Sequence, residues 1–129
     1  MILFFPLAFT EVCTEELCSV RDRMEKYGEL KATVFAISVD SMFALKKFKE
    51  EKNYPFDLLS DFNKTVSQKY HALHDEFVAF GMKNVTKRAA FVIDQQQTIR
   101  YVEILDNPTE IPNFQAIENI LKEIQSTSQ

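Results

Sequence analysis

Residues 1–13 read MILFFPLAFTEVC, an apolar run followed by a polar, acidic segment that contains Cys13. Ile2–Phe5 is short and wholly apolar, which predicts a buried strand, and Pro6 ends that strand because proline has no N–H to donate. After a loop, a helical pattern begins, and its apolar side chains recur every three or four residues on one face: Cys13, Leu17, Val20, Met24 and Tyr27. Gly28 suits the position just after the last turn. The stretch therefore predicts a strand, a loop and a helix with Cys13 in its first turn.

The rest of the chain alternates between strand and helix patterns. Ala32–Val39 (ATVFAISV) is a continuous β-branched and apolar run, which is typical of a strand covered on both faces. Asp40 or Ser41 can cap a second helix that ends near Lys52. The other predicted features are Phe43 and Phe48 turned inward on that helix, a strand at Phe56–Leu59, a short helix capped by Asn63 that carries Val66 and Tyr70, a loop over His71–Thr86, strands at Arg88–Asp94 and Thr98–Leu105, and an amphipathic helix at Phe114–Ile124.

The order of these elements, β-α-β-α-β-α-β-β-α, indicates an α/β fold. Right-handed crossovers make the early strands parallel, and the late hairpin adds antiparallel pairing. A mixed sheet with helices on both faces matches the thioredoxin-like architecture, and the length of 129 residues predicts a single domain over residues 1–129. Thioredoxin carries C-x-x-C at its first helix, whereas this chain carries C-x-x-x-x-C there. Disulfide exchange on the thioredoxin pattern is therefore not supported.

The composition excludes several classes of function. Fifteen Lys and Arg against nineteen Asp and Glu give a net charge of −4, whereas binding nucleic acid or an anionic membrane calls for a basic face. The two glycines cannot form the common glycine-rich phosphate loops. Met1–Phe9 is apolar but lacks a basic flank and a cleavage site, and it is too short to span a membrane. We therefore expect a soluble cytoplasmic protein with mostly reduced cysteines and no nucleic-acid or membrane partner.

Cys13 is the strongest candidate for chemistry. The first turn of a helix favours an anion and is among the sites that lower a thiol pKa. The hydroxyl of Thr10, three residues earlier, can face the sulfur across the loop, and Pro6 can shield the thiol. A thiolate there is a plausible nucleophile, while a small buried hydrophobic side chain is the alternative interpretation of Cys13.

These residues carry a family resemblance. Pro6, Thr10 and Cys13 form P-x-x-x-T-x-x-C after an apolar strand, which resembles the peroxiredoxin signature. Glu16 stands where many peroxiredoxins carry an acidic or amide residue, and the similarity continues through LCSVRDRM, AISVD, YPFDLLSDFN and KRAAFVID. The chain is most similar to the alkyl hydroperoxide reductase/thiol-specific antioxidant group, with its AhpE-like and bacterioferritin comigratory protein-like members. Arg88 matches the arginine that completes the family's site, and Lys87 is the poorer candidate.

The resemblance implies a thiol-dependent peroxidase that reduces hydrogen peroxide or alkyl hydroperoxides. The thiolate of Cys13 would attack one peroxide oxygen and become a sulfenic acid. Thr10, Arg88 and backbone N–H groups near Val12 and Cys13 would stabilise the developing charge. The expected partners are the peroxide and a thiol reductant such as a thioredoxin or a glutaredoxin-like protein. No metal or organic cofactor is expected.

Cys18 resembles the resolving cysteine of the bacterioferritin comigratory protein type, which stands at the same spacing from the first cysteine. Residues five apart in an ideal helix have Cα atoms roughly 8–9 Å apart, which is beyond the limit of about 7 Å for a disulfide. A Cys13–Cys18 bond therefore requires the helix to unwind, which is cheap near a helix terminus. The alternative is resolution by an external thiol.

His71 and His74 form H-x-x-H near Asp75 and Glu76, and we expect a solvated loop there, not a zinc site.

Peroxiredoxins usually carry an N-terminal strand pair before the strand matched by Ile2–Phe5, whereas this sequence begins at that strand, so we expect either a fragment or late start codon or a minimal variant. Apolar residues in the loop Pro6–Thr10 and at Tyr54–Pro55 predict a homodimer formed next to the site. The competing hypotheses are a non-catalytic thioredoxin-fold interaction module or redox sensor, and a disulfide oxidoreductase. Family members often carry glycine where His71 stands, so the loop is expected to differ locally.

Overall fold

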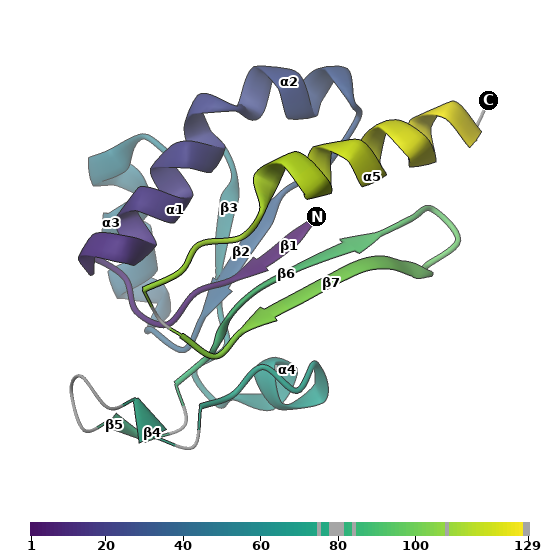
Figure 1. The fold of residues 1–129 in the computed structure, drawn as a ribbon. Coiled ribbons are helices and arrows are strands. Elements are labelled where there is room, and N and C mark those ends of the chain that lie inside the picture. Colours follow the sequence, from purple (N-terminus) through teal and green to yellow (C-terminus); the bar gives the residue numbers. More distant parts are fainter. Residues whose placement is uncertain (75, 78–81, 84, 108, 128–129) are drawn as a thin grey trace.

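The computed structural model describes residues 1–74, 76–77, 82–83, 85–107 and 109–127 (Figure 1). The order of elements agrees with the sequence pattern, apart from an extra helix and two very short strands. The elements are β1 (Ile2–Phe4), α1 (Glu11–Asp22), α2 (Met24–Glu29), β2 (Phe35–Ser38), α3 (Met42–Lys52), β3 (Asp57–Ser60), α4 (Thr65–Lys69), β4 (Glu76–Phe77), β5 (Met82–Lys83), β6 (Arg88–Ile93), β7 (Ile99–Leu105) and α5 (Phe114–Thr127).

The main sheet is mixed, as predicted. Its strands lie in the order β3-β2-β1-β6-β7. β1 is parallel to β2 and β2 is parallel to β3, because a helical crossover links each strand to the next. β6 is antiparallel to both β1 and β7. The start of β6 therefore lies beside the end of β1, where the chain leaves the sheet toward α1.

Helices cover both faces of this sheet (Figure 1). Successive strand residues point to opposite faces, so Leu3 and Phe5 join one core cluster and Phe4 joins the other. The larger cluster packs against α1, α2, α3 and α5. The smaller cluster lies on the side of α4, where it includes Ala72 and contacts Tyr70. The fold class expected from the sequence is confirmed.

The single first helix expected from the apolar pattern is instead two helices, α1 and α2, that meet at Arg23. Arg23 and Lys26 donate to the carboxylate of Glu118 in α5, at 2.8 and 3.1 Å. Glu118 is fully buried, so this pairing fixes α2 against α5. Gly28 lies inside α2, which ends at Glu29 with Leu30 as its C-cap. The expected role of Gly28 as the residue after the helix is therefore wrong.

The caps and faces of α3 and α4 also differ in part from expectation. The Ser41 hydroxyl accepts the Ala44 N–H at 3.2 Å, which confirms the predicted cap of α3. Phe48 is buried, but Phe43 is 77% exposed, because Phe48 shares the inward face with Leu45. The expected cap by Asn63 is wrong, because Lys64 is the residue that precedes α4. The Asp61 carboxylate accepts the N–H groups of Val66 and Ser67 in the first turn instead.

The segment His71–Thr86, which was expected to be a loop, contains β-pairing among the residues that the structure describes. β4 pairs antiparallel with β5, and Leu73 bridges Thr86. The His74 N–H donates to the Val85 carbonyl at 2.8 Å, which satisfies groups that a solvated loop would leave to water. Within the described part of the chain, no helix is long and apolar enough to cross a membrane.

Candidate functional site

The candidate site forms where β1 ends and α1 begins. Cys13 is the third residue of α1 and is only 1% exposed. Thr10 precedes the helix in extended conformation, and its carbonyl accepts the Thr14 N–H at 2.9 Å to close the first turn. The Thr10 hydroxyl does not cap the helix but donates to the Leu7 carbonyl at 2.8 Å. This bond folds the loop over the helix start, and Pro6 is buried at its base.

Arg88 reaches this site from the start of β6. β6 pairs antiparallel with β1, and β1 ends next to Arg88. Arg88 therefore lies near Cys13, although it is 75 positions further along the chain. The guanidinium donates to Glu16 Oε1 at 2.7 Å and also interacts with the sulfur of Cys13. Arg88 is 1% exposed, which rules out a surface charge. Lys87 points elsewhere and pairs with the exposed Asp106 at 2.7 Å.

The electrostatic balance at Cys13 differs from the sequence expectation. Burial raises the pKa of the Cys13 thiol, although Arg88 and the hydrogen bonds from Thr10 and the Leu7 backbone oppose that rise. The expected net lowering of this pKa is wrong, because the helix start that favours an anion is also desolvated here. Thr10 has one hydroxyl proton, so it must turn from the Leu7 carbonyl before it donates to the sulfur.

Glu16 is the second buried acid of the site. Burial raises the pKa of its carboxyl to about 7, although the charge and hydrogen bond of Arg88 oppose the rise. Among the residues that the structure describes, its second oxygen, Oε2, has no hydrogen-bond partner. Burial also lowers the pKa of Arg88, but Glu16 and Cys13 outweigh that effect and keep the guanidinium charged. Arg88 is thus a cation held between two groups that can become anions.

Cys18 lies in the same helix but in different surroundings. It is half-buried, and its Sγ is 3.6 Å from the Tyr54 hydroxyl oxygen. Both cysteines are free thiols and both lie inside α1. The intact helix keeps their Cα atoms roughly 8–9 Å apart, which is too far for a disulfide.

Tyr54 is a contact of the site that the sequence analysis did not identify. It is 3% exposed, so its expected contribution to an exposed apolar patch is wrong. Its ring stacks on Phe56 and meets Phe48 edge to face. Burial raises the pKa of the Tyr54 hydroxyl, and the bond to Cys18 adds to the rise. The only signal in the sequence was the position of Tyr54 just after the end of α3. That position does not indicate a contact with Cys18, which lies 36 residues away in the chain.

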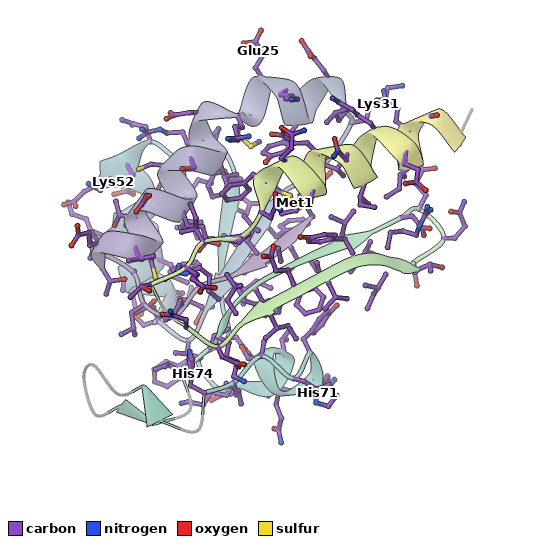
Figure 2. All side chains as sticks on the ribbon, in the orientation of Figure 1. Met1, Glu25, Lys31, Lys52, His71 and His74 are labelled. Atoms are coloured by element: carbon purple, nitrogen blue, oxygen red, sulfur yellow. The ribbon has the colours of Figure 1, made fainter. Side chains whose placement is uncertain are left out.

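The two histidines lie outside this site. Figure 2 shows His71 and His74 beside α4, far from α2 with its Glu25. His71 is exposed and has φ of 56°, a backbone conformation that favours glycine. His74 is 9% exposed, so the expected solvated loop is wrong for this residue, while Asp75 lies outside the described residues. Within the described ranges, no group of three or more His, Cys, Asp and Glu is placed to hold a metal.

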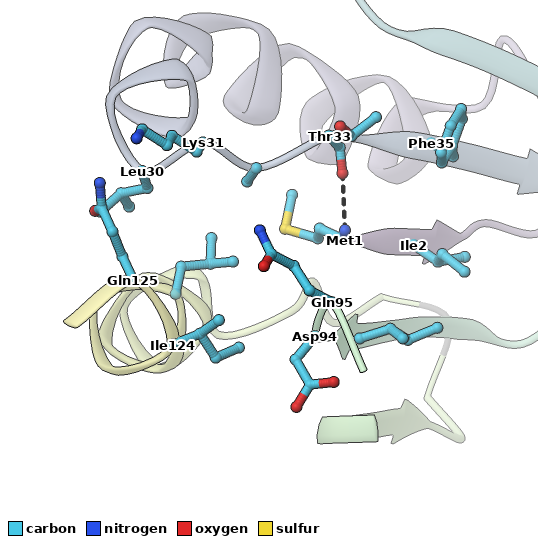
Figure 3. Close-up of a pocket in the computed structure, with 13 residues that line it drawn as sticks. Met1, Ile2, Leu30, Lys31, Thr33, Phe35, Asp94, Gln95, Ile124 and Gln125 are labelled. Atoms are coloured by element: carbon cyan, nitrogen blue, oxygen red, sulfur yellow. Dashed lines mark hydrogen bonds between the residues drawn. The ribbon is translucent and has the colours of Figure 1, made fainter. Parts of the chain in front are cut away.

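A cavity of about 430 Å³ lies at the opposite end of β1 (Figure 3). Met1 and Ile2 line it, and the Met1 ammonium donates to the Thr33 carbonyl at 2.8 Å. Cys13 follows the other end of β1, so the cavity does not open onto the candidate site.

Comparisons with known proteins agree with this arrangement. The model of the AhpC/TSA family matches residues 1–102. A bcp peroxiredoxin of Coxiella burnetii is 36% identical over 103 residues, covering 79% of this chain and 68% of the relative. Alkyl hydroperoxide reductase E of Mycobacterium tuberculosis is 32% identical over 113 residues, covering 86% and 69%.

The structural comparison points the same way. The crystal structure of the peroxidoxin BcpB from Mycobacterium tuberculosis superposes with a TM-score of 0.82 at 28% identity, covering 95% of this chain and 77% of that one. The chain spans about half to two thirds of the length of the curated relatives that it matches. These matches confirm the resemblance: the chain belongs to the AhpC/TSA family, among relatives named as peroxiredoxins.

Proposed function

We propose that this chain is a thiol-dependent peroxidase for hydrogen peroxide or alkyl hydroperoxides, with Cys13 as the nucleophile. The observation that carries the proposal is the buried Arg88, which contacts Glu16 and Cys13 at the start of α1. A buried cation beside a thiol lowers the free energy of the thiolate. Arg88 already has a buried acidic partner in Glu16, so the structure does not need Cys13 as a second acid to balance its charge. Family membership supports the same chemistry.

The first step is an in-line displacement. The Cys13 thiolate attacks one oxygen of ROOH, an S–O bond forms and the O–O bond breaks. Sulfur is oxidised by two electrons to a sulfenic acid, and the leaving RO⁻ takes a proton to become an alcohol or water. Arg88 can donate to the sulfur and to a peroxide oxygen at once, because its donors lie in one plane. Thr10, once it turns from the Leu7 carbonyl, and the first N–H groups of α1 would stabilise the charge that develops on the leaving oxygen.

The second step returns Cys13 to the thiol. We infer that Cys18 attacks the sulfenic sulfur, with loss of water, to give a Cys13–Cys18 disulfide. Helix α1 must unwind locally for the sulfurs to meet, and Cys18 must leave Tyr54. A thioredoxin or a glutaredoxin-like reductant then reduces the disulfide. If α1 stays folded, an external thiol resolves the sulfenic acid instead.

Stopped-flow oxidation tests the first step. Cys13→Ser should abolish the fast phase with peroxide, whereas Cys18→Ser should leave it nearly unchanged and make turnover depend on added thiol. A fast phase that survives Cys13→Ser contradicts the proposal. A sensor would be oxidised once without turnover, and a disulfide oxidoreductase would reduce insulin. Turnover with peroxide and the absence of insulin reduction would therefore separate the peroxidase from both alternatives.

We further infer that residues 1–129 act as one thioredoxin-like domain in the cytoplasm, where a thiol reductant can complete the cycle. We also infer a homodimer, supported by the exposed side chains of Phe9 in the site loop and of Met42 and Phe43 at the start of α3. Their exposed fractions are 48%, 67% and 77%. Analytical ultracentrifugation at micromolar concentration should give a dimer, and Phe43→Glu should shift the species toward monomer. A wild-type monomer contradicts the inference.

A further inference from the structure

We propose that Asp40 is a positioning residue for the peroxide-reducing site: its carboxylate, fixed at the end of β2, holds the loop that carries Thr10. This inference rests on the proposed function. Asp40 Oδ2 accepts the Ala8 N–H at 2.8 Å, across 32 positions of the chain. Ala8 lies in the middle of the loop between β1 and α1, two residues before Thr10.

Asp40 is itself anchored on several sides. The buried Ser38 hydroxyl donates to the same Oδ2 at 2.6 Å and accepts the Asp40 N–H at 3.2 Å. The Ser60 hydroxyl, at the end of β3, donates to the Asp40 carbonyl at 2.6 Å. The Asp40 carboxylate is therefore a fixed acceptor at the carboxyl ends of β2 and β3. Its bond to Ala8 positions the loop relative to these two strands.

The loop needs such a fixed point because its conformation is unfavourable without one. Phe9, between Ala8 and Thr10, has φ of 65°, which a bulky residue adopts only when its surroundings hold it there. Its ring packs on Phe48 at a centroid distance of 4.8 Å. The bond at Ala8 and this ring contact hold the strained residue from both sides.

The loop in turn supplies two of the groups that favour the Cys13 thiolate. Hydrogen bonds from Thr10 and from the Leu7 backbone both lower the Cys13 pKa, against the effect of burial. Asp40 is not among the charges that shift this pKa. Loss of its carboxylate is therefore expected to act on Cys13 through the placement of the loop and not through direct electrostatic repulsion.

The neighbouring strand offers a matched control. Asp61 follows β3 at the same edge, and its carboxylate accepts the N–H groups of Val66 and Ser67 at 3.1 and 2.6 Å. Asp61 thus holds α4 by the same kind of bond with which Asp40 holds the loop. Asp61→Ala and Asp40→Ala each remove one anchoring carboxylate, but only Asp40→Ala frees the loop beside Cys13.

The experiment uses two readouts at Cys13 in a Cys18→Ser background, so that only one thiol remains. The first is the pH midpoint of iodoacetamide alkylation, and the second is the rate of oxidation by hydrogen peroxide. Asp40→Ala should raise the alkylation midpoint and slow oxidation roughly tenfold to a hundredfold, because small displacements of positioning groups cost that much. Asp40→Asn should restore most of both, since an amide oxygen can accept the Ala8 N–H.

Urea unfolding of Asp40→Ala and Asp61→Ala provides the stability control. If Asp61→Ala, at a similar loss of stability, changes both readouts as much as Asp40→Ala does, the positioning role is overturned. It is also overturned if Asp40→Ala leaves both readouts unchanged. If the parent protein lacks oxidation by peroxide but the alkylation midpoint still moves only in Asp40→Ala, the proposed function fails while the positioning of Cys13 by Asp40 stands.

Discussion

The start and the middle of α1 each hold a cysteine, and the two environments differ in every respect that matters for chemistry. Cys13 is 1% exposed and contacts a buried cation, Arg88, which a buried acid holds in place. Cys18 is half-buried and contacts a neutral hydroxyl, that of Tyr54. One helix therefore presents one sulfur beside a cation that opposes the effect of burial on its pKa, and another sulfur whose polar contact is a neutral hydroxyl. The difference assigns nucleophilic attack to Cys13 and leaves Cys18 for a later step.

Removal of Arg88 should have the largest effect on this comparison. Arg88→Met should slow oxidation of Cys13 by roughly 10²–10³-fold, the usual cost of losing one preorganised donor. The alkylation midpoint of Cys13 should rise, because the largest effect that opposes burial is gone. Lys87→Met is the matched control, since Lys87 pairs with exposed Asp106 instead. Equal losses in both variants would mean that Arg88 has no special role.

The acid that holds Arg88 should make the free energy of unfolding depend on pH. The Glu16 pKa is about 7 in the folded state against 4.5 ordinarily, so the folded state binds more protons between these values. Stability is then fully present below pH 4.5 and falls as the pH rises toward 7, by up to about 3 kcal/mol.

Urea denaturation across this pH range checks the prediction, with Glu16→Gln as the reference that cannot ionise. The wild-type protein should lose more stability than Glu16→Gln over the same interval. Parallel pH curves for the two proteins would show that Glu16 ionises as easily in the folded state as in the unfolded chain.

Tyr54 should give the smallest effect, and it concerns Cys18 alone. Tyr54→Phe keeps the ring between Phe48 and Phe56 but removes the hydroxyl that contacts Sγ. A hydrogen bond of this kind contributes about 1 kcal/mol, so the disulfide step should accelerate severalfold while the first oxidation stays unchanged. Rapid quench followed by thiol counting measures both steps. A change in the first oxidation, with an unchanged second step, would contradict the assignment of Tyr54 to Cys18.

How much of this could be predicted from the sequence depends on how far apart the interacting residues lie. The placement of Cys13 in a first helical turn and of Arg88 at a strand start follows from local patterns, and both are confirmed. The contact of Arg88 with Glu16 spans 72 positions, so only the resemblance could indicate that they meet. The break at Arg23 escapes prediction because Glu118, almost at the other end of the chain, fixes it.

Burial was the other quantity that local patterns could not supply. Phe43 and Phe48 both fit an inward helix face by residue type, yet Phe43 is 77% exposed because the face is set by the packing of Leu45 and Phe48. The pKa of Cys13 shows the same limit. The helix start alone predicts a lowered value, and the desolvation that reverses it appears only once the surrounding core is in place.

Sulfenic acid trapping with dimedone tests the division of roles in α1 most directly. The Cys18→Ser protein is treated with one equivalent of hydrogen peroxide in the presence of dimedone, and the adduct is mapped by mass spectrometry; Cys13→Ser is treated in the same way. We predict a stoichiometric adduct at Cys13 in the first protein and none at Cys18 in the second. An adduct at Cys18 of Cys13→Ser, with Cys13 of Cys18→Ser left unlabelled, would contradict the account.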